Sequence, residues 1–205
     1  RYIHQENTVN QCFPEYKRIC LIKTSTSSGE NFLGGYRSGL EKNPDVEQFT
    51  VIYQISDMPA LFGEQEIAAN AFSVDSTFFK IFPYRVIAGS GRIVRSRDVV
   101  ITRSFWKKKL GGKNAIGATF KNTKGNKFTI IGVVDDPDTK TSWMPDIFMS
   151  DELDEFLFFD PIYAMLMAPD TDIALLNKKY SKEHPRSKWS TYETVRYQYL
   201  PLKDL

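Results

Sequence analysis

Apolar residues alternate with polar ones, or form short unbroken runs, along most of this 205-residue chain. Both patterns are typical of β-strands, half-buried in the first case and fully buried in the second. Strands are predicted at residues 18–24, 46–56, 65–72, 84–88, 98–102, 118–122, 127–134, 147–150, 161–168 and 191–202. The segment Thr123-Lys124-Gly125-Asn126 joins two of them, and Gly125 can supply the positive φ that a hairpin turn needs.

Helical spacing of apolar residues occurs only in short segments. Helices are predicted at residues 77–82, 103–110 and 172–183, with a weaker one at 30–41 because that segment contains three glycines. Asp75-Ser76 can cap the first of these helices, and Gly111-Gly112 can supply a left-handed cap after the second. The chain therefore combines a majority of strands with a few short helices.

The order of these elements indicates a lobe that is interrupted by an insertion. When residues 62–144 are set aside, the remaining segments form a βαβ–βαβ arrangement. This is the arrangement of a split ferredoxin-like lobe, which brings both ends of an inserted block to one place. We therefore predict an α+β fold, in which residues 1–61 and 145–205 form one lobe and residues 62–144 form an inserted, mainly β second lobe.

Composition favours a folded domain. Hydrophobic residues make up 41% of the chain, which argues against disorder. The longest uncharged apolar runs have about seven residues, whereas a membrane-spanning helix requires roughly 20. The chain begins at Arg1 and has no segment with the layout of a signal peptide, so we interpret it as an excised piece of a longer protein. If the parent is a membrane protein, its spanning helices lie outside this piece.

The two cysteines, Cys12 and Cys20, do not make a disulfide framework, and their spacing fits no zinc-binding pattern. Cys20 stands in the apolar run 19–22, so we expect it to be a small buried side chain in preference to half of a bridge. The sequence leaves open whether the two are bridged, and they do not indicate a compartment.

Charge is strongly divided, although the net charge is only +2. Residues 92–127 carry eleven bases against one acid, Asp98, and residues 135–172 carry eleven acids against one base, Lys140. Either the two surfaces are solvated and neutralise each other within the molecule, or the basic one contacts an anionic partner. The candidate partner-binding face consists of Arg92, Arg95, Arg97, Arg103, Lys107, Lys108, Lys109 and Lys113. The remaining bases of the block are Lys121, Lys124 and Lys127.

Catalytic and cofactor-binding patterns are not found, so we predict no enzyme, no metal site and no cofactor. The two histidines, His4 and His184, stand beside charged or polar residues and are interpreted as surface residues. Gly89-Ser90-Gly91 lacks the following helix and lysine of a phosphate-binding loop, so we interpret it as a turn after a strand. No Gly-x-Ser-x-Gly or His-Glu-x-x-His motif occurs.

Three further features have a functional and a structural interpretation. The acidic cluster at 151–155 could hold calcium, but it lacks the spacing of an EF-hand, so a solvated acidic face is favoured. The neighbouring Phe156, Phe158 and Phe159 are expected in a core; if exposed, they would form a patch for a partner or a membrane surface. The basic block has no helix-turn-helix or RNP-like signature, so nucleic acid is not the expected partner.

Six segments in order along the chain follow short motifs of apolar strand positions, caps and turn glycines. They are Glu6 with Phe13-Pro14 and Arg18-Ile19; residues 74–89; residues 98–104; residues 110–117; residues 128–137; and residues 199–204. Together they resemble the periplasmic core domain of MacB/FtsX-type ABC-transporter permeases, in the form common in Bacteroidetes. Ala115 stands where proline is usual in that family, and residues 138–190 carry little of its pattern.

The resemblance implies a domain between two membrane helices, with a membrane-proximal, porter-like lobe and an outer, sabre-like lobe. It implies a place on the periplasmic face of the bacterial inner membrane. The implied partners are the protein's own transmembrane helices, a cytoplasmic ABC ATPase subunit whose ATP-driven closure reaches the outer domain, a second copy in a dimer, and a periplasmic protein or cargo. A free-standing periplasmic protein that binds a small ligand or lipid is the alternative, and it predicts an enclosed apolar pocket.

Overall fold

Strands dominate the computed structural model of this chain. It describes residues 9–26, 29–31, 42–141, 143–150, 161–180, 184–185 and 194–205. The strands are β1 (Ile19–Thr26), β2 (Gly29–Asn31), β3 (Val46–Phe62), β4 (Gln65–Val74), β5 (Val86–Gly89), β6 (Asp98–Thr102), β7 (Thr119–Lys121), β8 (Lys127–Val134), β9 (Ile147–Ser150), β10 (Ile162–Met167), β11 (His184–Pro185) and β12 (Thr194–Pro201). The helices are α3 (Phe78–Ile81), α4 (Arg103–Lys109), α5 (Ile173–Tyr180) and the 3₁₀ turn η2 (Leu202–Asp204). A mixed fold of mostly sheet with few helices is thereby confirmed.

The predicted elements agree closely with these bounds, including the hairpin of β7 and β8, where Gly125 has a φ of 79°. Gly111 and Gly112 follow α4 with φ values of 66° and 68°, as the predicted left-handed cap requires. The weak helix predicted at 30–41 is not seen at its start, since residues 29–31 form β2, and residues 32–41 lie outside the described part. Neither β2 nor β11 was predicted.

One prediction about length was wrong, because β3 continues to Phe62 and does not end near residue 56. The pairing of β3 with β4 shifts register between Ile55 and Met58, and Asp57 adopts a φ of 51° in this bulge. The bulge interrupts the alternation of buried positions that the sequence pattern relies on. Beyond it the alternation resumes, with Met58 and Ala60 buried, so the strand is a single element of 17 residues.

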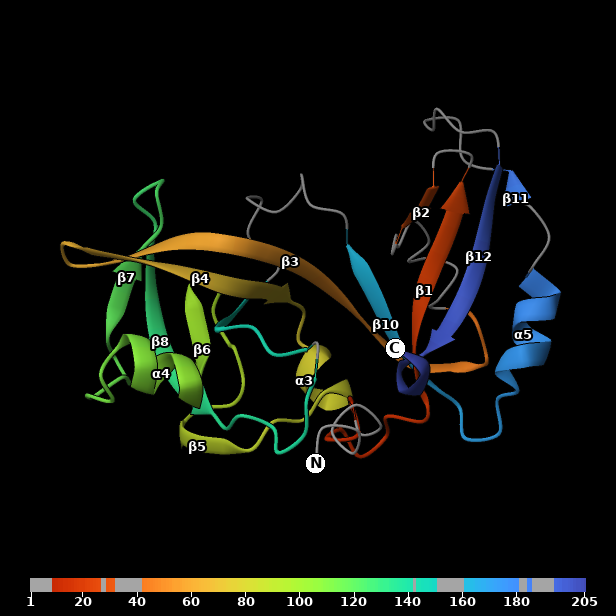
Figure 1. Cartoon of the computed structure of the whole chain (residues 1–205), viewed down its shortest axis with the longest axis horizontal. Coiled ribbons are helices and arrows are strands. Elements are labelled where there is room, and N and C mark those ends of the chain that lie inside the picture. The colour runs from red at the N-terminus through yellow and green to blue at the C-terminus, as the bar shows by residue number, and fades with distance from the viewer. Residues whose placement is uncertain are drawn as a thin grey trace.

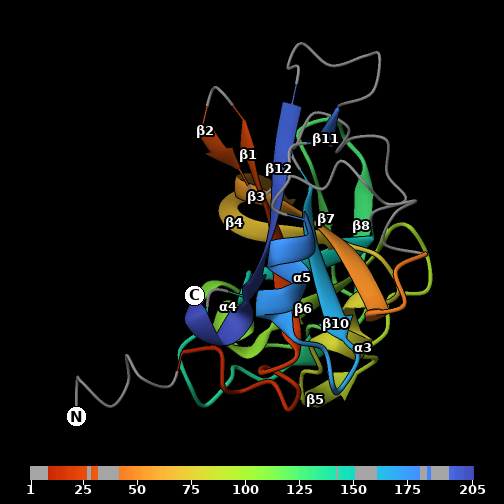
Figure 2. The ribbon, with the colours of Figure 1, turned by 90° about the vertical axis from the view of Figure 1, so that its right-hand side faces the viewer.

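The first group of strands is antiparallel and has the order β12-β1-β10-β3, with β11 at its outer edge (Figure 1). Helix α5 covers one face of this group, as Figure 2 shows. The Asn177 side chain fixes the helix to β12, since it accepts from Tyr199 N (2.7 Å) and donates to Tyr199 O (2.9 Å). Cys20, Met165 and Leu176 are buried between helix and sheet.

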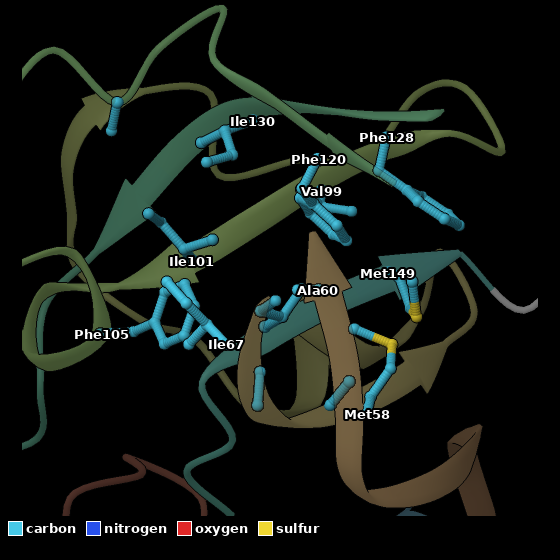
Figure 3. Close-up of a cluster of buried hydrophobic side chains, with 14 of the residues drawn as sticks. Met58, Ala60, Ile67, Val99, Ile101, Phe105, Phe120, Phe128, Ile130 and Met149 are labelled. Atoms are coloured by element: carbon cyan, nitrogen blue, oxygen red, sulfur yellow. The ribbon is translucent and has the colours of Figure 1, made fainter. Parts of the chain in front are cut away.

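The second group forms a closed circuit in which β3, β4, β9, β6, β8 and β7 pair in turn, and β7 pairs again with β3. Two of the pairs, β4 with β9 and β6 with β8, are parallel. Figure 3 shows side chains from these strands and from α4 pointing toward one another inside the barrel, including Ile101, Phe105 and Phe120. Closure leaves β5 as the edge strand at the barrel end of the sheet.

A third cluster of buried side chains fills the space where the two groups meet. It contains Ile19 and Ile52 from the first group, and Val100, Val134 and Phe148 from the outer face of the barrel. Strands β6 and β9 and the end of β8 are therefore buried on both faces, which explains why their sequences are unbroken apolar runs. Because the groups share this core and the strand β3, they pack as one body.

Two glycines hold β5 close to β8. A Cβ on Gly132 would lie 1.6 Å from the carbonyl oxygen of Ser90, and one on Gly89 would lie 2.2 Å from that of Ile131. The turn predicted at Gly89-Ser90-Gly91 is present, with a φ of 66° at Gly89. These contacts give a packing reason for the glycines in two of the six motifs.

Candidate transmission and docking surfaces

The two ends of the described chain meet at Asn10, which is completely buried and has a φ of 64°. Its Nδ2 donates to the carbonyl oxygen of Leu202 in η2 (3.4 Å), and its Oδ1 accepts from Thr141 Oγ1 (2.8 Å). Its backbone N–H donates to the carbonyl oxygen of Lys140 (2.9 Å). Asn10 therefore joins the N-terminal segment, the C-terminal turn and the loop between the barrel strands β8 and β9.

The first and last long strands, β1 and β12, are also neighbours, paired from Cys20 and Pro201 to Ser25 and Arg196. Arg18 fastens the start of β1 to the sheet, since its Nε donates to the carbonyl oxygen of Met167 (2.9 Å). It also forms ion pairs with Glu15 (3.0 Å) and Glu47. The chain thus enters and leaves the first group of strands at one place.

Asp75 ties α3 to the point where β3 passes between the two groups. Its Oδ1 accepts from Thr50 Oγ1 (2.8 Å), and its Oδ2 accepts from Val51 N (3.0 Å). The same Oδ1 accepts from the backbone N–H groups of Thr77 (2.9 Å) and Phe78 (3.2 Å). The predicted cap is therefore present, and it also bonds to a strand 25 residues away.

Aromatic residues of two motifs pack together beside Asp75. Phe13 makes an edge contact with Phe82, with ring centroids 5.0 Å apart. Phe78 lies 5.5 Å from Phe148 of β9. The Phe-Pro motif at the N-terminal segment and the Phe-rich motif of α3 therefore form one aromatic cluster, which fixes the N-terminal segment against the outside of the barrel.

A groove of about 660 Å³ lies beside this cluster, lined by residues 11–14, 83–85 and 135–139. Its lining mixes Cys12, Tyr84 and prolines with Arg85 and three aspartates, so it differs from the enclosed apolar pocket that a lipid-binding protein would need. Burial raises the pKa of the Cys12 thiol and raises that of the Tyr84 hydroxyl well above its usual range. The Tyr84 hydroxyl donates to the carbonyl oxygen of Trp143.

Both cysteines are free, and the expectation that Cys20 is a small buried side chain is confirmed. Burial raises the pKa of the Cys20 thiol to about 12. The thiolate is the reactive form of cysteine, so neither group is activated at neutral pH. No cluster of three His, Cys, Asp or Glu side chains able to hold a metal ion occurs in the described residues. Nor is any helix in that part of the chain long and apolar enough to cross a membrane.

The candidate basic residues lie on the barrel group, at both ends of β6. Arg103 follows its C-terminal end and pairs with the buried Asp135 (2.9 Å), which also pairs with Arg85. Arg97 precedes its N-terminal end and lies over the ring of Phe128, 5.9 Å from the ring centre. The two arginines are separated by the whole strand, roughly 20 Å at 3.3 Å per residue.

Four lysines of the candidate face gather at the C-terminal end of α4. Lys107, Lys108 and Lys109 form its last turn and are exposed. Lys113 is exposed too, and its carbonyl oxygen accepts from Trp106 Nε1 (2.6 Å), which holds it against the helix. Cations are stabilised at this end of a helix. Arg92 and Arg95 are exposed on the connection between β5 and β6.

Neutralisation of this block within the described residues is slight, since Arg103 with Asp135 is the one ion pair that its bases form there. Asp136 accepts from Ser104 N (3.2 Å) and Oγ (2.8 Å), and so caps α4. The acidic cluster at 151–155 and Phe156, Phe158 and Phe159 lie outside the described residues, as does His4.

Sequence reasoning missed Asn10 as a joining residue. A single asparagine carries no motif, and its partners are 131 and 192 residues away. The available signal was indirect, because asparagine is one of the few residues that adopts a left-handed backbone readily. The second role of Asp75 was also missed, for the same reason of distance along the chain.

The described residues form a mostly β domain, and they contain no cluster of His, Cys, Asp or Glu side chains that could hold a metal ion. The family model described as the MacB-like periplasmic core domain matches residues 7–179, and the chain belongs to this family. It is accordingly a periplasmic domain of an ABC-transporter permease of the MacB type, on the periplasmic side of the inner membrane.

Solved structures show the same fold. A domain of a protein described as a permease, from Porphyromonas gingivalis, has a TM-score of 0.73 at 19% identity, and the match covers 92% of each chain. The periplasmic region of MacB from Actinobacillus actinomycetemcomitans has a TM-score of 0.64 at 15% identity, with 83% of each chain covered. The extracellular domain of the ABC-type transporter YknZ from Gram-positive bacteria has a TM-score of 0.60 at 13% identity, covering 89% of this chain and 99% of that one. No curated protein matches the sequence.

Proposed function

We propose that this domain docks a partner and transmits ATP-driven movement of membrane helices to its outer lobe, with no chemistry of its own. The observation that carries the proposal is the junction at Asn10, where the N-terminal segment is hydrogen-bonded to the C-terminal turn and to the loop between the barrel strands β8 and β9. A displacement of either chain end would be transmitted to the barrel through the hydrogen bonds at this buried junction.

The proposed division is a membrane-proximal lobe of residues 1–61 and 145–205 and an outer lobe of residues 62–144. Strand β9 and the second half of β3 belong to the first lobe by these bounds but pair within the barrel, so they join the two lobes. The order β12-β1-β10-β3 supports a split ferredoxin-like lobe. In the sheet, β10 lies between the sequential strands β1 and β3, and β1 lies between the sequential strands β10 and β12. Two interleaved crossovers of this kind are what a βαβ–βαβ arrangement produces.

Strand β3 is the proposed transmitting element. Its first half pairs with β10 and its second half pairs with β4 and β7, so one continuous backbone belongs to both groups. Asp75 fixes the crossing point at Thr50 and Val51. Because pairing continues along the strand from Val46 to Phe62, a displacement of its first half would be carried into the barrel.

The proposed partners are the protein's own transmembrane helices, a cytoplasmic ABC ATPase subunit, a second copy of the permease in a dimer, and a periplasmic protein or cargo. The exposed and largely unpaired bases of the barrel group support docking of an anionic partner there. Burial raises the pKa of both thiols, so neither cysteine is a candidate nucleophile at neutral pH.

Native Cys12 offers a direct test of transmission. It lies in the groove between the N-terminal segment and the barrel, whereas Cys20 is fully buried and serves as the internal control. In the full-length transporter, trapped with ATP or free of nucleotide, we expect the alkylation rate of Cys12 to differ by about threefold or more, because opening a groove exposes the thiol. Cys12→Ser should abolish the signal. Equal rates in the two states would show that movement does not reach this junction.

A further inference from the structure

The hairpin of β7 and β8 has an apolar inner face and a cationic outer face. Inside the barrel, Phe120 and Phe128 stack with ring centroids 5.2 Å apart. On the outer face, Lys121 stands directly opposite Lys127, and both side chains are exposed. Lys124 is exposed in the turn between them. Three cations therefore occupy the end of one short hairpin.

The register places Lys121 and Lys127 in the closer of the two kinds of antiparallel pair. Backbone bonds join Ile130 N to Ala118 O (2.9 Å) and Asn122 N to Asn126 O (3.0 Å). Hydrogen-bonded pairs alternate with non-hydrogen-bonded ones, so the lysine pair between these positions is of the second kind, with Cα atoms about 4.5 Å apart. Like charges directly opposite each other destabilise a sheet.

No carboxylate among the described residues compensates this pair. Asp98 lies beside Thr129 on the neighbouring strand, two positions along from Lys127, and its carboxylate already accepts from Arg95 N (3.1 Å). Glu66 stands two strands away from Lys121, across Leu61. At strand spacings of about 4.8 Å their Cα atoms are roughly 10 Å apart, and the two side chains form no ion pair in the structure. Two like charges placed directly opposite each other without a compensating contact indicate that the lysine pair has a functional role.

The hairpin points away from the chain ends. In Figure 1 the turn between β7 and β8 stands at the upper end of the barrel, whereas residues 9–18 and the C-terminus lie lower. The membrane that would hold both ends is therefore not the surface that the hairpin faces. Its partner must approach from the periplasmic space.

The polar and cationic residues of the hairpin indicate which class of partner it binds. Its residues are polar, and the Asn122 side chain is used within the turn, where Oδ1 accepts from Lys124 N (3.1 Å) and Asn126 N (2.9 Å). Protein interfaces are built around aromatic and arginine anchors and are depleted in lysine. The hairpin has three lysines and no exposed apolar anchor, and a lysine ammonium is a point charge well suited to phosphate.

We propose that this hairpin binds a soluble polyanion that carries phosphate groups, with Lys121 and Lys127 sharing one phosphate and Lys124 contacting the next. A bound phosphate would remove the repulsion within the pair. The proposal deepens the docking function and rests on it, since it names the chemical class of the docked partner.

The test compares two double variants of the 205-residue chain that remove the same charge. Lys121→Gln with Lys127→Gln alters the pair, and Lys42→Gln with Lys80→Gln, two exposed lysines outside the basic block, is the matched control. The probe is medium-chain inorganic polyphosphate, titrated at several salt concentrations. On a flexible strand each phosphate contact adds roughly 0.7 to the slope of log affinity against log salt, so the pair variant, which loses the one phosphate shared by Lys121 and Lys127, should lose about 0.7 in slope and about tenfold in affinity.

The control variant should stay within about twofold of the parent. Equal losses in the two variants would overturn the proposal, because binding would then follow net charge alone. Poly-glutamate of equal charge that binds as tightly as polyphosphate would also overturn it, and would identify an acidic polypeptide as the partner. Either result leaves the transmission role intact, since Cys12 labelling reports on that role separately.

A second readout separates binding from folding. Lys127→Glu replaces the like-charge pair by an opposite pair, so it should raise the melting temperature by about 1–3 °C while abolishing polyphosphate binding. A variant that gains stability and loses its ligand cannot have lost it through unfolding. A lowered melting temperature would show that the lysine pair is structurally favourable and would remove the argument for a ligand.

Discussion

At the scale of single residues, the family motifs are explained by a few close contacts. Gly132 and Gly89 allow β5 to approach β8 closely. The carboxylate of Asp75 accepts hydrogen bonds from four donors. The sequence predicted the cap at Asp75 and the turn after Gly89, because both depend on neighbouring residues. It could not predict that Asp75 also binds Thr50, because nothing local encodes a partner 25 positions away.

Asp75→Ala should lower the free energy of unfolding by about 2–4 kcal/mol, since it leaves Thr50 Oγ1 and Val51 N without their acceptor. Urea unfolding followed by circular dichroism measures the change. The matched control is Asp138→Ala, an exposed aspartate, which should stay within about 0.5 kcal/mol of the parent. Equal effects of the two substitutions would refute the role given to Asp75.

Gly132→Ala should destabilise the chain by about 2–4 kcal/mol, because the new Cβ would stand 1.6 Å from Ser90 O and force β5 away from β8. Gly63→Ala serves as the control, since Gly63 has a positive φ of 64° but open space around it. Backbone strain alone costs about 1–2 kcal/mol there. If thermal unfolding gave Gly63→Ala the lower melting temperature of the two variants, the close approach of β5 to β8 at Gly132 would be contradicted.

At the scale of elements, the sequence predicted nearly every strand and helix but not the full length of β3. The alternation of apolar and polar residues predicts a strand only as far as a bulge, where the alternation shifts by one residue. Asp57, with its φ of 51°, lies at the bulge in β3. The pattern also could not show that β7 closes the barrel against β3, because that contact is a single register pair between Leu61 and Lys121.

Substitutions at Asp57 test whether the bulge is a required bend. Asp57→Gly should stabilise the chain by about 0.5–1 kcal/mol, because glycine adopts a positive φ without strain. Asp57→Val should destabilise it by about 1–2 kcal/mol, because a β-branched residue is strained there. Chemical denaturation of both variants gives the comparison. If valine were tolerated as well as glycine, the left-handed backbone at this position would be unsupported.

At the scale of the whole molecule, the family could be inferred from six ordered motifs, and the family match over residues 7–179 confirms it. The sequence did not show that the chain ends are hydrogen-bonded to each other, because the contact between Asn10 and Leu202 spans almost the entire chain. Docking, dimerisation and the division into lobes remain predictions that rest on this architecture.

Replacement of Asn10 should loosen both chain ends together. Asn10→Gly keeps the positive φ but removes the bonds to Leu202 O and Thr141 Oγ1, so it isolates the contribution of the side chain. We expect a loss of about 1–3 kcal/mol in stability. Amide hydrogen exchange should become faster both in residues 139–143 and in residues 202–205. Faster exchange in one of these segments alone would mean that Asn10 does not couple them.

The meeting of the first and last described residues also has a practical consequence for protein engineering. A domain whose ends emerge side by side can be transplanted into a surface loop of an unrelated carrier without long linkers. The strand β3 sets the limit of such transplants, because it is shared by both groups of strands. A chimera that exchanges one lobe for that of a relative would have to cut this strand, so the unit that can be moved between proteins is the whole domain.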